Sequence, residues 1–310
     1  MEEYRPLEKY YRTYTYMLKK RFGQNVIRVS LDGGFSCPNR DGTKGIGGCI
    51  FCDNSSFSPV SSIPNPIKTQ IHYVMEHLKH PEKYAGFIAY FQPFTNTYAP
   101  VDKLRKIYYE AIEEEGCLGL ALGTRPDCVP EDVLTLLEEI NQKYFVTVEL
   151  GLQSVYNESL KFINRGHTFE DFVDAANRAK KHGLTVAAHI ILGIPGETKE
   201  MMLRSCEVIS NLPIDILKIH QLQIVKDTKL EQIYNETHFK VWDIEEYSDF
   251  ITDFVEYLRD GLYIQRLFSR SVSGNIVAPR WNVKLLTDTI MQKFQEKDIR
   301  QGKKFKYKGE

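Results

Sequence analysis

The 310-residue sequence has no apolar run that approaches the ~18 residues of a membrane-spanning helix. It also has no apolar stretch of the signal-peptide type near Met1, which charged residues follow. We therefore expect a cytoplasmic protein that does not associate with membranes. Because thiols stay reduced in that compartment, we expect the six cysteines to be ligands or packing residues rather than disulfides.

A second Cys-x2-Cys pair, or a His-x3-His pair, that could complete a structural zinc site is also missing. Instead, Cys37, Cys49 and Cys52 share one glycine-rich loop with the spacing Cys-x11-Cys-x2-Cys. Iron–sulfur sites are usually closed by four protein ligands. Three thiolates can bind three irons of a cubane cluster and leave the fourth iron open. We therefore predict that these three cysteines are metal ligands and that a small molecule completes the coordination.

Two other uses of these cysteines stay open at this point. The first is a zinc site with an unidentified fourth ligand. The second is a thioredoxin-like redox pair of Cys49 and Cys52, which would leave Cys37 and the glycines without a role. The other three cysteines occupy apolar surroundings far along the chain, and we expect them to pack in the interior. They are Cys117, Cys128 and Cys206.

Apolar, β-branched runs alternate with helical patterns, which predicts an α/β fold with a parallel sheet wrapped by helices. Such a series can close fully or partly into a barrel. The expected strands are residues 26–31, 86–91, 118–122, 145–150, 185–192 and 216–224. The expected helices are residues 68–79, 101–115, 130–141, 158–164, 169–182 and 199–211, followed by 244–259, a short segment 263–268, and 284–295. We divide the chain into an N-terminal basic, aromatic segment (1–22), a core barrel (23–228) and a C-terminal extension (229–310) that covers the barrel mouth or edge.

Unusual residues gather in the loops that follow the expected strands, where barrel enzymes place their active sites. Glu149 and Gln153 can bind the ribose hydroxyls and the amino-acid end of a nucleoside cofactor, and the backbone at Gly193 and Ile194 can pair with an adenine edge. Alternation along the sixth strand puts Lys218 and His220 on one face. These two form either a hydrogen-bonded core pair or a catalytic pair facing the substrate.

Positive charge concentrates at the two ends of the chain. Residues 1–30 carry seven Lys/Arg against three Asp/Glu, and residues 301–310 carry four against one. Such ends can hold a polyanion, although a short lysine-rich tail is usually just solvated. Nearby aromatics could stack on unpaired bases or, at helical spacing, pack against the barrel, and we favour packing. They are Tyr10, Tyr11, Tyr14 and Tyr16.

Taken together, the motifs resemble the radical S-adenosylmethionine (radical SAM) core of the Elongator catalytic subunit, and more closely the YtqA/YhcC-like bacterial radical SAM family. The resemblance rests on the cysteine loop with residues 33–42, and on residues 124–127, 149–154, 165–168, 193–197, 218–220 and 278–281. It implies a partial (β/α)6 TIM-like barrel that holds a [4Fe-4S] cluster on Cys37, Cys49 and Cys52. SAM would bind the fourth iron through its amino and carboxylate groups.

The resemblance also implies roles for single residues. It places Gln92 and Thr95 near the methionine part of SAM, Glu149, Gln153 and Ser154 at its polar groups, and Gly193 with Ile194 at the adenine; we count Arg165 and His189 among the cofactor-binding residues as well. One departure is that the Elongator-type core has Glu before Thr-Arg-Pro-Asp, where this chain has Gly123. Glu149 would then take over the carboxylate role.

The implied reaction begins when a one-electron donor such as flavodoxin or ferredoxin reduces the cluster. SAM then yields a 5′-deoxyadenosyl radical, which abstracts a hydrogen atom from the substrate. The resemblance implies tRNA as the partner, with conversion of 5-carboxymethylaminomethyluridine at the wobble position to 5-aminomethyluridine. Two alternatives remain: a radical SAM enzyme for a small metabolite or tetrapyrrole, because coproporphyrinogen dehydrogenases share related motifs, and a non-enzymatic metal-binding module.

Overall fold

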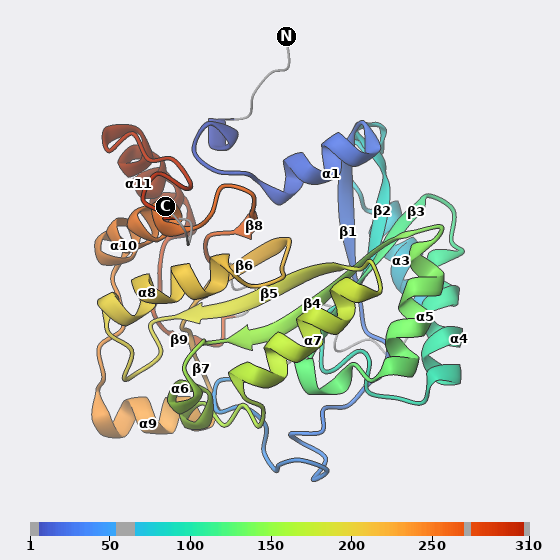
Figure 1. The fold of residues 1–310 in the computed structure, drawn as a ribbon, viewed down its shortest axis with the longest axis horizontal. Helices are drawn as coiled ribbons and strands as arrows, with labels where there is room; N and C mark the ends of the chain where they lie inside the picture. Colours follow the sequence, from blue (N-terminus) through green and yellow to red (C-terminus); the bar gives the residue numbers. More distant parts are fainter. Residues whose placement is uncertain (1–5, 54–65, 270–273, 307–310) are drawn as a thin grey trace.

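The computed structural model describes residues 6–53, 66–269 and 274–306. Within these ranges, seven parallel strands form one sheet in the order β1-β2-β3-β4-β5-β6-β8. Figure 1 shows that the sheet curls into a half-barrel with helices on its outer face. The predicted partial α/β barrel is therefore confirmed. Its strands are Asn25–Leu31 (β1), Tyr84–Phe91 (β2), Cys117–Thr124 (β3), Phe145–Gln153 (β4), Thr185–Leu192 (β5), Ile216–Gln221 (β6) and Tyr263–Arg266 (β8).

The outer helices alternate with the strands, and their ends follow local sequence signals. Pro130 caps the start of α5, with two acidic residues in the first turn, as predicted. Thr168 and Asp171 form a capping box that starts α7, and Gly183 follows its end with φ of 68°. These helices are Ile67–Glu76 (α3), Val101–Ile112 (α4), Glu131–Asn141 (α5), Asn157–Phe162 (α6), Phe169–Lys181 (α7) and Lys199–Ser210 (α8).

The C-terminal region differs most from the prediction. The sixth strand ends at residue 221 instead of 224, and the next two residues that pair, Ile224–Val225 (β7), leave the sheet to join Ile276–Ala278 (β9) in an antiparallel pair. The short segment at 263–268 supplies β8, a seventh strand that was not predicted. The remaining helices are Lys229–Thr237 (α9), which was also not predicted, Ile244–Tyr257 (α10) and Val283–Glu296 (α11). Among the described residues, no helix combines the length and apolar character needed to cross a bilayer.

The inner face of the half-barrel has an apolar half and a polar half. On the side that faces the helix Tyr14–Phe22 (α1), an apolar cluster is closed by Tyr14 and Leu18 of that helix. The strand residues of this cluster are Ile88, Tyr90, Ala121, Phe145, Ala187 and Ile216. Toward the carboxyl ends, the same faces of the strands carry Glu149, His189 and Lys218. The polar half is therefore the part of the interior that is available for chemistry.

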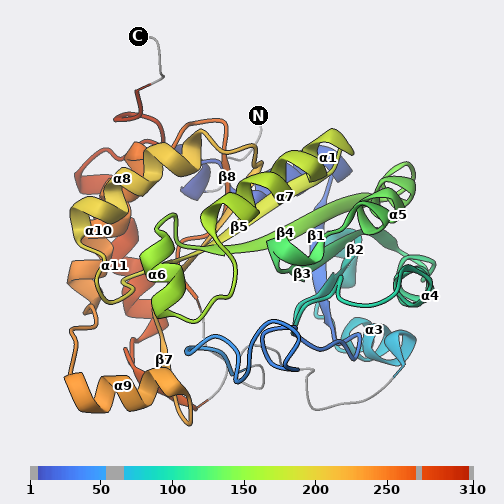
Figure 2. The ribbon, with the colours of Figure 1, turned by 60° about the horizontal axis from the view of Figure 1, so that its bottom comes forward.

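The N-terminal aromatics are structural. Tyr10, Tyr11 and Tyr14 are buried, and the rings of Tyr10 and Tyr11 lie 5.2 and 5.9 Å from the ring of Phe294 in α11. Tyr16 is half-buried on α1. The burial confirms packing, rather than base stacking, for the first three tyrosines. Figure 2 shows α1 at the end of the barrel away from the loop that follows β1.

Candidate active site

The cysteine loop after β1 is held in place by hydrogen bonds within its own backbone and by amide side chains that donate to backbone carbonyls. The backbone N–H groups of Arg40 and Asp41 donate to the carbonyl of Cys37, and that of Cys52 donates to Cys49 at 3.0 Å. The Asn39 amide donates to the carbonyl of Asn164 at 2.6 Å, while the Asn164 amide donates to the carbonyl of Gly48 at 2.8 Å. These reciprocal bonds fix the loop to the turn after α6.

Two glycines of the cysteine loop are required because side chains of the same loop approach them closely. A Cβ at Gly45 would lie 2.4 Å from the Asn39 Oδ1, and a Cβ at Gly48 would lie 2.9 Å from the Arg40 Nε. Gly48 also has φ of 80°, which is unfavourable for side-chain-bearing residues. The glycine content of the loop therefore serves its compact shape.

The thiols are surrounded by N–H donors and positive charge. Arg165 Nη1 donates to the Cys49 Sγ at 3.5 Å, and the Asn39 amide reaches the same sulfur at 3.8 Å. Burial raises the pKa of the Cys52 thiol to about 11, with a contribution from Cys49. The pKa of Arg40 is raised overall. Burial lowers it, but the neighbouring Cys52, Cys37 and Cys49 raise it by more. Buried sulfurs facing cations and N–H groups suit thiolate ligands, because such contacts stabilise negative charge and tune a cluster's potential.

The chemistry of the donor set suits an iron–sulfur cluster. Thiolates are the usual protein ligands of such clusters, and one loop brings Cys37, Cys49 and Cys52 together. Among the described residues, no group of three His, Cys, Asp or Glu side chains is already arranged around a metal-ion position. The role of the three cysteines as cluster ligands stays a prediction.

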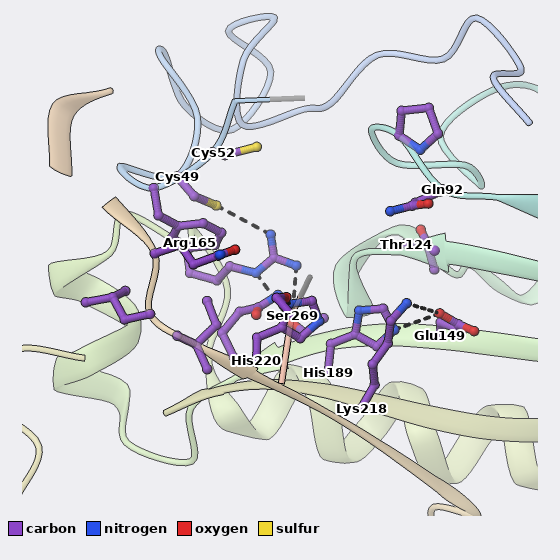
Figure 3. Close-up of a pocket in the computed structure, with 18 of the residues that line it drawn as sticks. Cys49, Cys52, Gln92, Thr124, Glu149, Arg165, His189, Lys218, His220 and Ser269 are labelled. Carbon is purple, nitrogen blue, oxygen red and sulfur yellow. Dashed lines mark hydrogen bonds and ion pairs between the residues drawn. The ribbon is translucent and has the colours of Figure 1, made fainter. Parts of the chain in front are cut away.

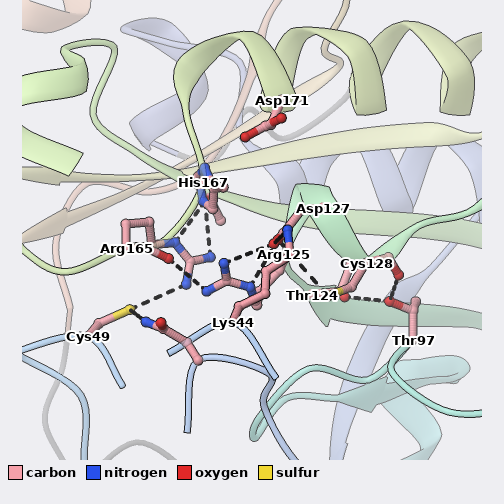
Figure 4. A network of polar contacts seen from close by, with 12 residues as sticks. Lys44, Cys49, Thr97, Thr124, Arg125, Asp127, Cys128, Arg165, His167 and Asp171 are labelled. Carbon is pink, nitrogen blue, oxygen red and sulfur yellow. Dashed lines mark hydrogen bonds and ion pairs between the residues drawn. The ribbon is translucent and has the colours of Figure 1, made fainter. Parts of the chain in front are cut away.

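Behind the loop, two sequence motifs form one polar network, shown in Figure 4. Arg125 is buried and pairs with Asp127 at 2.9 Å, and Asp127 also pairs with Lys44 of the cysteine loop at 2.6 Å. Arg125 Nη1 donates to the carbonyl of Arg165 at 2.8 Å. The network thus connects the residues after β3 to the arginine that contacts Cys49.

Gly151 on β4 anchors this arginine. Its carbonyl accepts hydrogen bonds from Arg165 Nη2 and from His167 Nε2, both at 3.1 Å. A Cβ at residue 151 would lie 2.4 Å from the Arg165 Nη2, so a larger residue would push the arginine away. Gln153 follows with φ of 70°, a conformation that non-glycine residues adopt rarely and that often marks functional sites.

One cavity opens beside the cysteines, as Figure 3 shows. It brings together many of the residues predicted as ligands, cofactor contacts or catalytic groups. These are Cys49, Cys52, Gln92, Glu149, Gln153, Arg165, His189, Lys218 and His220. Gly123, the position where the related core has Glu, also lines the cavity and is the register partner of Glu149.

Other predicted residues lie outside the cavity lining. The Thr95 N–H donates to the carbonyl of Ser36, the Ser154 hydroxyl donates to Glu197 at 2.5 Å, and the Gly193 N–H donates to the Met202 Sδ at 3.2 Å. Ile194 is buried among apolar side chains. Cys37 belongs to the cysteine loop but does not line this cavity. SAM contacts by Thr95, Ser154, Gly193 and Ile194 stay predictions.

Glu149 is the centre of a buried charge cluster on the cavity floor. Its Oε1 lies 2.5 Å from Arg28 Nη2, and its Oε2 lies 2.8 Å from His189 Nε2 and 3.1 Å from Lys218 Nζ. Burial alone would raise the pKa of Glu149, but Arg28, Lys218 and His189 hold it well below its usual range. The carboxylate is therefore ionised, with hydrogen bonds to His189 and Lys218 on Oε2 and an ion pair to Arg28 on Oε1.

The basic groups around Glu149 have pKa values below their usual range. Burial lowers the pKa of Lys218 to about 7, against an opposing effect of Glu149. Burial and Lys218 lower the pKa of His189 to about 4, and burial with Arg266 holds the pKa of His220 well below its usual value. Both histidines are neutral at pH 7, whereas Lys218 is divided between its two forms. Groups poised in this way are typical of functional sites.

Lys218 and His220 face the cavity as strand alternation predicted, but they are not paired with each other. Lys218 donates to Tyr90 and Glu149, whereas His220 contacts Arg266 and Ser269. The structure also adds residues that the sequence analysis missed: Arg28, Tyr90, Arg266 and Ser269. Arginines at positions 28 and 266, within otherwise apolar strand segments, were the available signal.

The chain matches known families over most of its length. The family model of the radical SAM superfamily matches residues 37–209, and that of the radical SAM C-terminal domain matches residues 214–296. The chain is 34% identical to YtqA of Bacillus subtilis over 305 residues, which cover 97% of this chain and 95% of that protein.

Two further similarities are partial. The chain is 36% identical over 145 residues to a tRNA uridine(34) acetyltransferase of Methanocaldococcus jannaschii, covering 45% of this chain and 26% of that enzyme. Its fold is similar to that of Elp3 from Methanocaldococcus infernus, with a TM-score of 0.67 and 21% identity over 89% of this chain and 64% of that one.

Proposed function

Because the chain belongs to the radical SAM superfamily, we propose that it modifies the wobble uridine of tRNA, converting 5-carboxymethylaminomethyluridine to 5-aminomethyluridine. As a member of this superfamily, it is an enzyme that uses a [4Fe-4S] cluster and SAM. The observation that carries the tRNA proposal is the match to an enzyme named for uridine 34 of tRNA. The fold shared with Elp3 is consistent with it.

Cys37, Cys49 and Cys52 would hold the cluster. Bound there, the cluster and SAM would supply one-electron radical chemistry for removing a hydrogen atom from the substrate. Arg165 keeps a positive charge and an N–H group on the Cys49 sulfur. Gln92 and Gln153 offer amide groups to the cofactor from the cavity wall, and Lys218 with His220 faces the substrate from the floor. The electron would come from a donor of the flavodoxin or ferredoxin class.

A cavity next to the first one would receive the nucleotides that flank the reacting base. A second cavity shares Gln221, Gln223 and Ser269 with the first and extends to Arg280 and Trp281. Arg280 is exposed and Trp281 is half-buried. Single-stranded RNA loops are commonly recognised by bases that stack on aromatic side chains and by cations that contact phosphate.

The basic termini are adjacent to each other. The Arg12 N–H donates to the Gln301 side chain at 2.9 Å, and the Gln301 N–H donates to the carbonyl of Tyr10 at 2.9 Å. This region lies with α1 at the end of the barrel opposite the cysteine loop (Figure 1). Exposed Lys19, Lys20 and Arg21 could therefore contact the stem of a bound tRNA, but not the reacting base.

The proposal is tested by mass spectrometry of tRNA nucleosides from cells that lack the gene. We expect 5-carboxymethylaminomethyluridine to accumulate, and complementation with the wild-type gene, but not with a Cys49→Ala gene, to restore the normal level. Unchanged nucleosides would reject the tRNA substrate. If the purified protein still formed 5′-deoxyadenosine from SAM in that case, a small-molecule substrate would replace tRNA.

A further inference from the structure

Positive charge exceeds negative charge in the cavity. Among the described residues that line it, Arg165, Lys218 and Arg266 are cationic groups, and Glu149 is the carboxylate. Arg165 is directed at the Cys49 sulfur, where cluster thiolates supply negative charge. Glu149 forms ion pairs with both Arg28 and Lys218, so one carboxylate is shared by two cations. Arg266, together with Lys218 in its charged form, therefore remains without a full counter-charge.

Arg266 is the least compensated of these groups. Its Nη2 lies 2.8 Å from both ring nitrogens of His220, a neutral side chain. Within the described part of the chain, its Nε is buried without a hydrogen-bond partner and no carboxylate forms an ion pair with it. A buried guanidinium in this state is unfavourable unless an anion completes it.

The neighbouring strand adds a second cation at the same level. Lys218 and Arg266 are register partners on β6 and β8, and both line the cavity. Ser269 contributes a hydroxyl 2.8 Å from the His220 Nδ1. Figure 3 shows Lys218 beside Glu149 and apart from Arg165 and the cysteines. Lys218 and Arg266 therefore belong to the part of the cavity that β6 and β8 form, here called the β6–β8 wall, whereas Cys49, Cys52 and Arg165 form the cysteine wall.

We propose that Arg266 and Lys218 form a subsite for a carboxylate of the substrate. The planar guanidinium matches a carboxylate through two parallel hydrogen bonds, and a lysine beside it adds a point charge. This inference rests on the proposed function, whose substrate carries a carboxymethyl group. Arg266 binds that group and turns the adjoining carbon toward the cysteine wall. A substrate that lacks the carboxylate leaves Arg266 uncompensated and binds more weakly.

The test uses calorimetry to compare the binding of an acid with that of its ester or amide, which keeps the amine but lacks the carboxylate charge. The protein is the reconstituted holoenzyme with 5′-deoxyadenosine and methionine, so that no turnover occurs. One pair of probes is 5-carboxymethylaminomethyluridine and its methyl ester, and the other is N-methylglycine and its amide. We expect about a tenfold preference for each acid in the wild type, in line with the strength of charge-assisted hydrogen bonds.

Variants separate the subsite from general effects. Arg266→Gln should abolish the preference, Arg266→Lys should keep part of it, and Arg300→Gln, at an exposed arginine, should keep all of it. Thermal unfolding confirms that each variant is folded. Equal binding of acid and neutral probe by the wild type, or binding of neither, would overturn the proposal. So would a loss of SAM affinity in Arg266→Gln with the acid preference intact, because Arg266 would then serve the cofactor.

The two proposals fail in different ways. If the N-methylglycine preference depends on Arg266 while tRNA nucleosides in the gene-deleted cells are normal, the subsite stands and the tRNA function falls. If 5-carboxymethylaminomethyluridine accumulates in those cells but the holoenzyme shows no preference for acids, the function stands and the subsite falls.

Discussion

The two walls of the cavity are built in opposite ways. On the cysteine wall, Arg165 has defined partners, because it donates to the Gly151 carbonyl and to the Cys49 sulfur. Behind this wall, Arg125 pairs with Asp127 and donates to the Arg165 carbonyl. On the β6–β8 wall, Lys218 donates to Tyr90 and Glu149 while burial lowers its pKa to about 7. Arg266 contacts His220, but its buried Nε has no hydrogen-bond partner among the described residues. Glu149 lies beside Lys218 and balances part of the charge.

The difference indicates which wall is complete without the substrate. Rigid, satisfied contacts position a cofactor that is used in every turnover. Buried cations without full compensation are unfavourable in the free protein and become favourable only when an anion binds. We therefore assign cofactor positioning to the cysteine wall and substrate selection to the β6–β8 wall.

Removal of the Glu149 carboxylate should have the largest effect on the stability of the folded protein. Glu149→Gln leaves Arg28 and Lys218 buried beside a neutral amide, and breaking a buried pair in this way destabilises by about 3–5 kcal/mol. Denaturant unfolding of the purified protein measures the change. The matched control is Glu139→Gln at the exposed pair with Arg105, which should lose less than about 1 kcal/mol. Similar losses in both variants would show that Glu149 is not the charge centre of the cavity.

Loss of Arg165 on the cysteine wall should lower the reduction potential of the cluster. Arg165→Gln removes a positive charge and an N–H group from the Cys49 sulfur, so the more negative, reduced cluster is less stabilised. We expect the reduction potential to fall by on the order of 60 mV, equivalent to a factor of ten for a one-electron couple. Redox titration followed by electron paramagnetic resonance measures it. An unchanged potential at full iron content would contradict the role assigned to Arg165.

The smallest effect concerns the pH dependence of the β6–β8 wall. Because the pKa of Lys218 is about 7, its ammonium is present below pH 7 and lost above it. Between pH 6 and pH 8 the charged fraction falls about tenfold, so KM for a carboxylate substrate should rise by up to that factor. Lys218→Arg stays charged and should give a flat KM profile. A wild-type KM that is independent of pH, or an equally steep rise in the variant, would exclude Lys218 from binding the carboxylate.

The same depressed pKa affects folding. The unfolded chain keeps Lys218 protonated up to its ordinary pKa of 10.5, whereas the folded protein releases that proton near pH 7. The unfolded state thus binds more protons between these values, and the Lys218 contribution to stability improves as the pH rises through this window. Lys218→Arg should lack that contribution in denaturant unfolding at pH 7 and pH 9.

The parts of the cysteine wall were recognisable from sequence because they are short motifs: the cysteine spacing, residues 124–127 and residues 165–168. The contacts between these motifs were not predictable, because Arg165 reaches Cys49 across 116 residues and Asn39 reaches Asn164 across 125. Strand positions and the cavity-facing side of Lys218 and His220 followed from periodicity. The β6–β8 wall was not predictable in the same way, because the neighbours Lys218 and Arg266 are set by a strand pairing across 48 residues. Arg28 reaches Glu149 through the curl of the sheet, which no local pattern encodes.

The central claim is that three cysteines hold a cubane whose fourth iron is open to SAM. Mössbauer spectroscopy of the anaerobically reconstituted, iron-57-labelled protein tests it most directly, with Cys49→Ala as the negative control and Cys117→Ser as the matched variant outside the loop. We predict a [4Fe-4S] spectrum in which one iron site changes when SAM is added, with no such cluster in Cys49→Ala and an unaltered one in Cys117→Ser. A cluster whose irons all ignore SAM, or a zinc ion fully coordinated by side chains, would contradict the account.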